Sequence, residues 1–279
     1  MDAETSASPL AAPKFDVNAQ RRELMRHIPR RSELEHLVRE SDGYAWLPAG
    51  TLGALPAAVR FAHKIFEERR FAAKPDPRTF RGADLLTATK YEAAPPFFDL
   101  ALSDEILQLA SDYMGEVPVL MIPRLWWTQP QGPNAEWGGT QLFHRGRLNA
   151  PHIRRQAKFL FTISDVDEES GPFTFLPADL SERILPSYRW GEHVSDEEMF
   201  RHIRPTDAMR LVGPAGTALM VDTCRCFHYG RRASSKDRLM LMVQFMRQAD
   251  VPEEDRVERS AAFIEKFADD PVRMFVIPD

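Results

Sequence analysis

The stretch "GTALMVDTCRCFHYGRRASSKDRLMLMVQFM", residues 216–246, decides the fold of this chain. It begins and ends with apolar runs that are typical of strands, and the segment "GRRASSKD" between them is rich in turn residues. Side chains alternate along a strand, so the first run predicts one face that carries Asp222, Cys224, Cys226 and His228. Arg238 follows ten residues after His228, and we expect it on the adjoining strand, within reach of the same cavity.

The block of short strands extends well before this stretch. Apolar runs divided by Gly, Pro, Asp and Asn predict further strands at residues 119–129, 140–146, 158–166 and 171–178. The whole block covers about residues 117–248 and has helical sequence on both sides. Many short strands flanked by helices predict an α+β protein with a mainly β core, arranged as a jelly roll of two sheets with N- and C-terminal helices outside.

The flanking helices are predicted from caps and from apolar periodicity. Ser32 and Glu35 have the spacing of a capping box, which predicts a helix that ends near Gly43. Further helices are predicted at residues 55–72, 103–115, 195–203 and 252–270. Residues 1–18 are rich in small residues and are predicted to be a disordered tail, which leaves residues 19–279 as a single domain.

Composition and charge narrow the functional classes. The chain has 279 residues, 43% of them hydrophobic, which is enough to bury one large core. Its formal net charge of −5 gives no overall basic footprint, so we expect no nucleic-acid polymer as a partner. No apolar run is long enough for a membrane span, and the first residues lack the pattern of a signal peptide. We therefore expect a cytoplasmic protein that acts on a small molecule and has no membrane partner.

The two cysteines, Cys224 and Cys226, are separated by one residue. A disulfide between such close neighbours on one strand would be strained, so we expect free thiols. With His228 they form a Cys-x-Cys-x-His run, which lacks the loop spacing and the second cysteine pair of a structural zinc site. Both cysteines are therefore predicted to be small core residues.

Two histidines lie on separate predicted strands. In "TQLFHRG", residues 140–146, the alternation places Leu142, His144 and Gly146 on one face. His144 and His228 can converge on one metal ion if their strands belong to the same small barrel. An arginine at position 238 suits a bidentate clamp on a carboxylate.

Four segments together resemble the phytanoyl-CoA dioxygenase-like family. They are "QLFH" (141–144), "KFLFTISDVDEESGPFTFLPAD" (158–179), "GPAGTALMVDTCRCFHYGRR" (213–232) and the following Arg238. Members of this family are non-haem Fe(II)/2-oxoglutarate-dependent oxygenases built on a cupin-like double-stranded β-helix. The resemblance implies an enzyme that oxidises an unactivated C–H bond. It also implies His144 and His228 as iron ligands, and Arg238 as the clamp on the distal carboxylate of 2-oxoglutarate.

The chain departs from the family pattern at one ligand. The family motif is His-x-Asp or His-x-Glu, but this chain reads His144-Arg145-Gly146, and the loop to Lys158 is longer than usual. The first interpretation is that Gly146 leaves an open position for a halide such as chloride. This resembles the Fe(II)/2-oxoglutarate halogenases, whose motif is His-x-Ala or His-x-Gly.

Two other interpretations of the missing acid remain open. In one, His152 from the longer loop replaces the carboxylate, which makes a three-histidine site and a hydroxylase or other oxygenase. In the other, the protein keeps the fold as a non-catalytic binding protein. The basic run "HRGRLNAPHIRR" is most often a solvated loop, but beside an active site it can hold an anionic substrate through Arg145, Arg147, Arg154 and Arg155.

Overall fold

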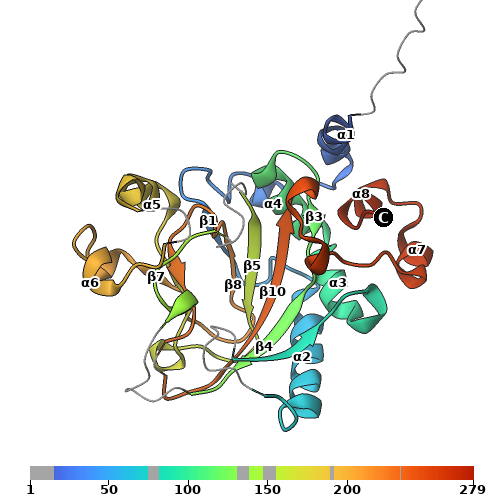
Figure 1. The fold of residues 1–279 in the computed structure, drawn as a ribbon. Coiled ribbons are helices and arrows are strands. Elements are labelled where there is room, and N and C mark those ends of the chain that lie inside the picture. The colour runs from blue at the N-terminus through green and yellow to red at the C-terminus, as the bar shows by residue number, and fades with distance from the viewer. Residues whose placement is uncertain (1–15, 75–81, 131–137, 147–154, 189–191, 233) are drawn as a thin grey trace, which may run out of the picture.

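The computed structural model describes residues 16–74, 82–130, 138–146, 155–188, 192–232 and 234–279. Two antiparallel sheets of unequal size form the centre, and helices lie on both outer sides (Figure 1). The predicted mainly β core with flanking helices is therefore confirmed, and its strands pair antiparallel. No helix among these residues has the length and apolar character needed to cross a membrane.

The larger sheet has seven strands, and every pairing in it is antiparallel. In spatial order they are β1 (Tyr44–Leu47), β8 (Ala218–Val221), β5 (Ala157–Thr162), β10 (Arg238–Met246), β4 (Arg124–Thr128) and β2 (Ala83–Thr87), with β3 (Val119–Leu120) beside the end of β10. Strand β10 is nine residues long and pairs with β3, β4 and β5, so it is the central strand of the sheet.

The two faces of β10 belong to different cores. Leu239, Leu241, Val243 and Phe245 pack into the large apolar cluster that also contains residues of the helices. Met240 and Met242 pack into a second cluster on the opposite face. Because side chains alternate along a strand, Arg238 points to the same side as Met240.

The smaller sheet consists of very short strands. Its order is β7 (Met209–Arg210), β6 (Thr174–Phe175) and β9 (His228–Tyr229). Isolated bridges extend it, because His144 pairs with His228 and Phe143 pairs with Val194. The two sheets face each other across the second apolar cluster, in which Trp126, Leu160 and Met240 of the larger sheet meet Phe173 and Phe175 of the smaller one.

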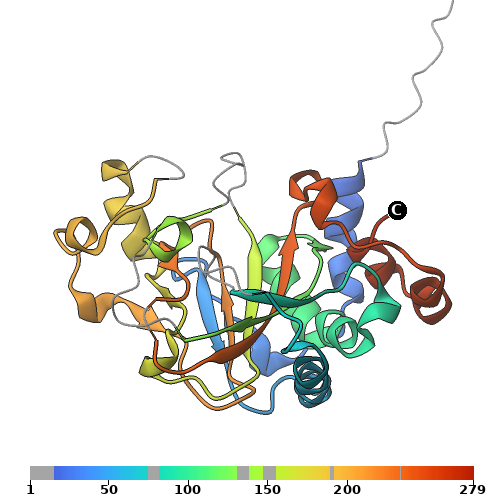
Figure 2. The same cartoon turned by 60° about the horizontal axis from the view of Figure 1, so that its bottom comes forward.

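Helices close both outer faces. On the larger sheet lie α1 (Val17–Leu24), α2 (Leu55–Arg69), α3 (Pro95–Ala101), α4 (Asp104–Met114), α7 (Ala261–Phe267) and α8 (Pro271–Val276), whose apolar residues share one cluster with β10. On the other side, α5 (Ala178–Ile184) and α6 (Asp196–Met199) lie next to the smaller sheet. Figure 2 shows this division, with the yellow and orange helices on one side and the blue, green and red ones on the other.

Several predicted helices are present with changed bounds. Helix α2 covers most of residues 55–72, and α4 ends as predicted at Gly115, which has a left-handed backbone (φ 73°). The helix predicted at residues 195–203 starts as expected, with the Ser195 side chain accepting a hydrogen bond from the Glu198 N–H, but α6 is only four residues long. Helix α1 begins at Val17, so the tail boundary predicted at residue 18 falls inside a helix.

The helix predicted from Ser32 to Gly43 is wrong. Only Ser32–Leu34 form a 3-10 turn, and His36 has a left-handed backbone (φ 64°) that is incompatible with a continuing helix. The Gln108 amide accepts from the Arg31 N–H (2.9 Å) and donates to the Arg31 carbonyl (3.0 Å), which holds the chain in an extended entry to the turn.

Candidate active site

His144 and His228 form a close pair in the smaller sheet. The His144 N–H donates to the His228 carbonyl (3.0 Å), and the His228 N–H donates to the His144 carbonyl (2.8 Å). Directly opposite residues of an antiparallel pair share a face, and the ring centroids are 4.3 Å apart. His228 is also opposite Phe175, which points into the apolar cluster between the sheets. Both imidazoles therefore face the space between the two sheets.

Backbone carbonyls fix the orientation of both imidazoles. Nδ1 of His144 lies 2.9 Å from the Leu142 carbonyl, and Nδ1 of His228 lies 3.0 Å from the Cys226 carbonyl. A carbonyl only accepts hydrogen bonds, so each Nδ1 carries the proton and each Nε2 keeps its lone pair. This is the tautomer of a histidine that binds a metal through Nε2.

The protonation state of the pair also suits a metal. Burial lowers the pKa of His144 to about 4, and a weaker contribution comes from His193 and Lys158. Burial likewise lowers the pKa of His228 well below its ordinary value, with further lowering by His144 and Lys158. Both rings are neutral at pH 7, which is the form that a divalent cation requires.

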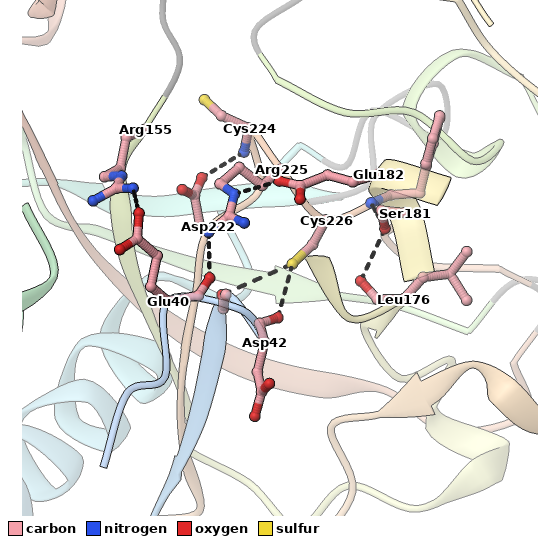
Figure 3. A network of polar contacts seen from close by, with 12 residues as sticks. Glu40, Asp42, Arg155, Leu176, Ser181, Glu182, Asp222, Cys224, Arg225 and Cys226 are labelled. Carbon is pink, nitrogen blue, oxygen red and sulfur yellow. Dashed lines mark hydrogen bonds and ion pairs between the residues drawn. The ribbon is translucent and has the colours of Figure 1, made fainter. Parts of the chain in front are cut away.

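The segment before His228 is a turn and not a strand. Strand β8 ends at Val221, and Asp222 then accepts at Oδ1 from the Cys224 N–H (2.9 Å) and at its carbonyl from the Cys226 N–H (2.9 Å). Figure 3 shows Asp222 within this network. The prediction that Asp222, Cys224, Cys226 and His228 share one strand face is therefore wrong. The buried Asp222 carboxylate, which also accepts from the Tyr113 hydroxyl (2.7 Å), terminates the strand.

Both cysteines are free and buried, as predicted. The Cys226 Sγ lies 3.9 Å from the Asp42 carbonyl and 3.8 Å from the Gly43 carbonyl (Figure 3). Burial raises the pKa of both thiols, and Asp222 raises it further, so they remain protonated. In the part of the chain that the structure describes, no group of three His, Cys, Asp or Glu side chains is placed to hold a metal ion.

Gly146 has a left-handed backbone (φ 71°), and its N–H donates to the Thr223 carbonyl (2.6 Å). Strand pairing has ended by this point, so the predicted common strand face of Leu142, His144 and Gly146 is not formed. The Thr223 side chain is bonded in turn to the Gln156 amide. The turn after β8 thus holds the backbone of Gly146 in a conformation that glycine adopts most easily.

His152, the third ligand expected in one interpretation, lies outside the described residues. A different histidine, His193, lies beside the pair. The Phe143–Val194 bridge places His193 next to His144, and their ring centroids are 5.7 Å apart. The Nε2 atom of His193 is buried and has no hydrogen-bond partner among the described residues. Sequence analysis missed His193 because no strand pattern surrounds it, and only a distant bridge brings it to the site.

Arg238 lies at the start of β10, opposite Thr128 of β4, and is 2% exposed. Its Nε has no hydrogen-bond partner, and among the described residues no carboxylate forms an ion pair with it. Burial and, to a smaller extent, Arg231 together lower the pKa of Arg238 to about 9. The expectation that Arg238 lies on the strand adjoining His228 is wrong, since β9 and β10 belong to different sheets. Both side chains nevertheless face the space between these sheets.

Only part of the predicted basic patch, Arg145 and Arg155, lies within the described residues. Arg155 donates to the Tyr113 carbonyl (3.0 Å) and is paired with Glu40 (Figure 3), so it is used within the fold. The Arg145 guanidinium lies 5.9 Å from the centre of the Phe227 ring. Arg147 and Arg154 lie outside the described residues. The described part of the patch therefore gives no independent support for an anionic substrate.

No protein-family model matches the sequence, and no curated protein matches it either. Solved structures do match the fold. The epimerase SnoN, solved in complex with Fe3+, alpha ketoglutarate and nogalamycin RO, aligns with a TM-score of 0.51 and 18% identity over 77% of this chain and 84% of its own. EctD from S. alaskensis with bound Fe aligns with a TM-score of 0.50 and 14% identity over 78% of this chain and 75% of its own. At these identities the comparison establishes a shared fold.

Proposed function

We propose that this protein is a non-haem Fe(II)/2-oxoglutarate-dependent oxidoreductase that acts on an unactivated C–H bond of a small molecule. One observation carries the proposal. Two neutral imidazoles with available Nε2 atoms and one unpaired buried guanidinium face the same space between two antiparallel sheets. The resemblance to the phytanoyl-CoA dioxygenase-like family and the fold shared with SnoN and EctD support it. In this proposal the two sheets form a double-stranded β-helix.

The described residues fit the two cofactors. His144 and His228 would hold Fe(II) through Nε2, and Arg238 would bind the distal carboxylate of 2-oxoglutarate. Together with dioxygen, the bound iron and 2-oxoglutarate supply the oxidising power that breaks the C–H bond. The protein would position the two cofactors and exclude water from them. The Phe173 and His228 ring centroids are 5.5 Å apart, and Met240 packs in the same cluster as Phe173, so apolar groups line the space beside the metal site.

We further propose that chloride occupies the metal position that Gly146 leaves open, which makes the protein a halogenase. No described carboxylate stands with the two histidines, so the metal keeps more of its positive charge than in a His-x-Asp site. The Lys158 ammonium of the larger sheet adds positive charge here, since, in addition to burial, it lowers the pKa of both histidines. A small anion neutralises part of this charge and needs little space, which glycine provides.

A salt titration tests the halide proposal. We expect the charge-transfer band of the anaerobic Fe(II)–2-oxoglutarate protein to shift with sodium chloride or bromide and not with a non-coordinating salt of equal ionic strength. Gly146→Asp should abolish the shift, and if activity survives it should replace halogenation with hydroxylation. Gly146→Asn is the matched control, since both residues tolerate a left-handed backbone but only Asp brings a charge. Full activity without halide and no halide-specific shift would reject the proposal.

His193 supports a second candidate, a three-histidine oxygenase. Its buried Nε2 has no partner, and its ring lies beside that of His144, so a change of rotamer could bring it to the metal. In a halogenase, His193→Asn and His152→Ala should both keep iron. If either variant loses iron as severely as His228→Ala, the three-histidine site is correct. A third outcome would identify a non-catalytic binding protein. In that case the wild type binds iron and 2-oxoglutarate but forms no succinate, whether or not a substrate is added.

A further inference from the structure

A second buried arginine lies close to Arg238. Arg231 is 3% exposed, and its Nε and Nη1 atoms are buried with no hydrogen-bond partner. No described carboxylate forms an ion pair with it. The next residue shows the contrast, because Arg232 donates to Asp196 (2.6 Å) and lies against the Tyr229 ring. The chain thus neutralises one of two successive arginines and leaves the other without an anion.

Arg231 has one contact with the segment before His144 and another near Gly82 and Thr128, at the end of the larger sheet. Its carbonyl accepts from the Gln141 amide (3.0 Å), which ties its backbone to the segment that leads to His144. The Nη1 atom of Arg231 lies close to Gly82. If Gly82 carried a Cβ atom, that atom would be 3.3 Å from the Arg231 Nη1 and 3.2 Å from the Thr128 Cα. Thr128 is directly opposite Arg238 in the β4–β10 pairing. The Arg231 guanidinium and the start of the Arg238 strand therefore both lie near Thr128, at the same end of the larger sheet.

The buried guanidinium groups of Arg231 and Arg238, which have no described carboxylate partner, destabilise the ligand-free protein. Removing each guanidinium from water has a desolvation cost, and the two charges repel each other. The pKa values respond accordingly: burial lowers that of Arg231, and burial followed by Arg231 lowers that of Arg238. Such an arrangement becomes favourable only when an anion binds between the two groups.

We propose that Arg231 and Arg238 together bind the distal carboxylate of 2-oxoglutarate. The inference rests on the proposed function, since it assumes that 2-oxoglutarate binds here. A carboxylate offers two oxygens with about four acceptor sites in total, enough for N–H groups from both guanidiniums. Arg231 would then make the pocket selective for 2-oxo acids that carry a second carboxylate.

The test compares two 2-oxo acids that differ only in the distal carboxylate. Affinities of the anaerobic Fe(II) protein for 2-oxoglutarate and for 2-oxopentanoate are measured in Arg231→Gln, Arg231→Lys and the wild type. Arg231→Gln should weaken 2-oxoglutarate binding by on the order of 10- to 100-fold and leave 2-oxopentanoate binding unchanged. Arg231→Lys should lie between, because it keeps the charge but not the fork. The control, Arg210→Gln, removes an exposed arginine of β7 that pairs with Glu168 (3.4 Å) and should change neither affinity.

Stability and coupling separate binding from a structural role. Ligand-free Arg231→Gln should unfold at the same urea concentration as the wild type or at a higher one, because the substitution removes an unpaired buried charge. In Arg231→Gln/Arg238→Gln the loss of 2-oxoglutarate affinity should be smaller than the product of the single losses, as expected for two groups on one carboxylate.

Three results would overturn the inference. Unchanged 2-oxoglutarate affinity in Arg231→Gln would assign Arg231 to another anion, such as a charged substrate. Equal weakening of both 2-oxo acids, or a lower unfolding midpoint, would assign it a structural role. A wild-type protein that binds no 2-oxoglutarate would instead contradict the proposed function itself, and with it the basis of the inference.

Discussion

The two sheets are held together in different ways. The larger sheet has continuous registers around a nine-residue central strand, and its outer face packs against helices. The smaller sheet has strands of two residues, and isolated bridges join it to His144 and Val194. Yet the smaller sheet carries both histidines of the candidate site. The difference teaches that the larger sheet supplies stability, whereas turns and single bridges set the geometry of the metal site.

The packing of the two outer faces agrees with this division. Phe245 of β10 belongs to the large apolar cluster with the helices, whereas Phe143, Phe227 and Met199 form a separate cluster under α5 and α6. Changes in the first cluster should therefore act on the free energy of unfolding. Changes at the histidines should act on metal affinity and, because both rings are buried, to a smaller extent on the free energy of unfolding.

The largest effect is expected for Phe245→Ala. Phe245 is fully buried and packs edge-to-face on Phe159, with ring centroids 6.0 Å apart. Loss of the ring leaves a cavity in the larger sheet and should lower the free energy of unfolding by about 3–5 kcal/mol, as measured by urea denaturation. Phe71→Ala, at a position that is 86% exposed, is the control and should change little. A loss below about 1 kcal/mol in Phe245→Ala would contradict the role given to the larger sheet.

His228→Ala tests the role given to the smaller sheet, which is to hold the metal ion. With one imidazole left, Fe(II) affinity should fall by on the order of 1,000-fold, about 4 kcal/mol, and loss of the buried ring should lower the urea midpoint less than Phe245→Ala does. His144→Ala should behave in the same way. Anaerobic iron titration provides the measurement, and His63→Ala, at an exposed position of α2, provides the control. Iron binding within tenfold of the wild type would exclude these histidines as the metal ligands.

The pH dependence of the metal-free protein should also reveal the pair. The folded pKa of His144 is about 4, below the ordinary 6.5, so the unfolded chain binds a proton first as the pH falls. The neutral ring contributes its full stability above pH 6.5, and about 3 kcal/mol is lost as the pH falls from there to the folded pKa. His144→Gln should flatten this part of the stability curve. An unchanged slope between pH 4 and 6.5 would show that the ring is not buried and neutral.

The smallest effect is expected from alanine substitutions at two glycines, measured on the free energy of unfolding. Gly146 near the smaller sheet and Gly115 after α4 both have a left-handed backbone, with φ values of 71° and 73°. Alanine at either position should cost about 1–2 kcal/mol in urea denaturation. Only Gly146→Ala should also change the halide response, since only Gly146 is proposed to face the metal. A halide response altered equally by Gly115→Ala would remove that distinction.

The sequence predicted best the elements that depend on long apolar patterns. Strands β5 and β10 and helices α2 and α4 were placed correctly, because each buries a regular face against the large cluster. The failures depend on contacts between distant residues. The helix predicted from Ser32 stops at Leu34, before the left-handed backbone of His36, and the Gln108 side chain bonds the backbone of Arg31 across 77 positions at the start of this turn.

For the candidate site, the sequence predicted the types of residue and missed part of their arrangement. His144 and His228 are paired as the resemblance implied, and their role as ligands stays a prediction. His193 reaches the pair only through the Phe143–Val194 bridge. Arg231 looked like an ordinary turn residue, because burial without a partner cannot be read from a turn sequence. Gly146 was singled out because it replaces the acidic ligand, its role stays a prediction, and its left-handed backbone was not foreseen.

The most direct test of the central claim is an anaerobic Fe(II) titration of the wild type with and without 2-oxoglutarate, followed by visible absorption. The claim predicts tighter iron binding with 2-oxoglutarate, because the cosubstrate supplies oxygen donors that the two histidines lack. A charge-transfer band should develop only when both are present, and Arg238→Ala should need about a hundredfold more 2-oxoglutarate to produce it. If the wild type gives no band and 2-oxoglutarate leaves the iron affinity unchanged, the protein is not an Fe(II)/2-oxoglutarate enzyme.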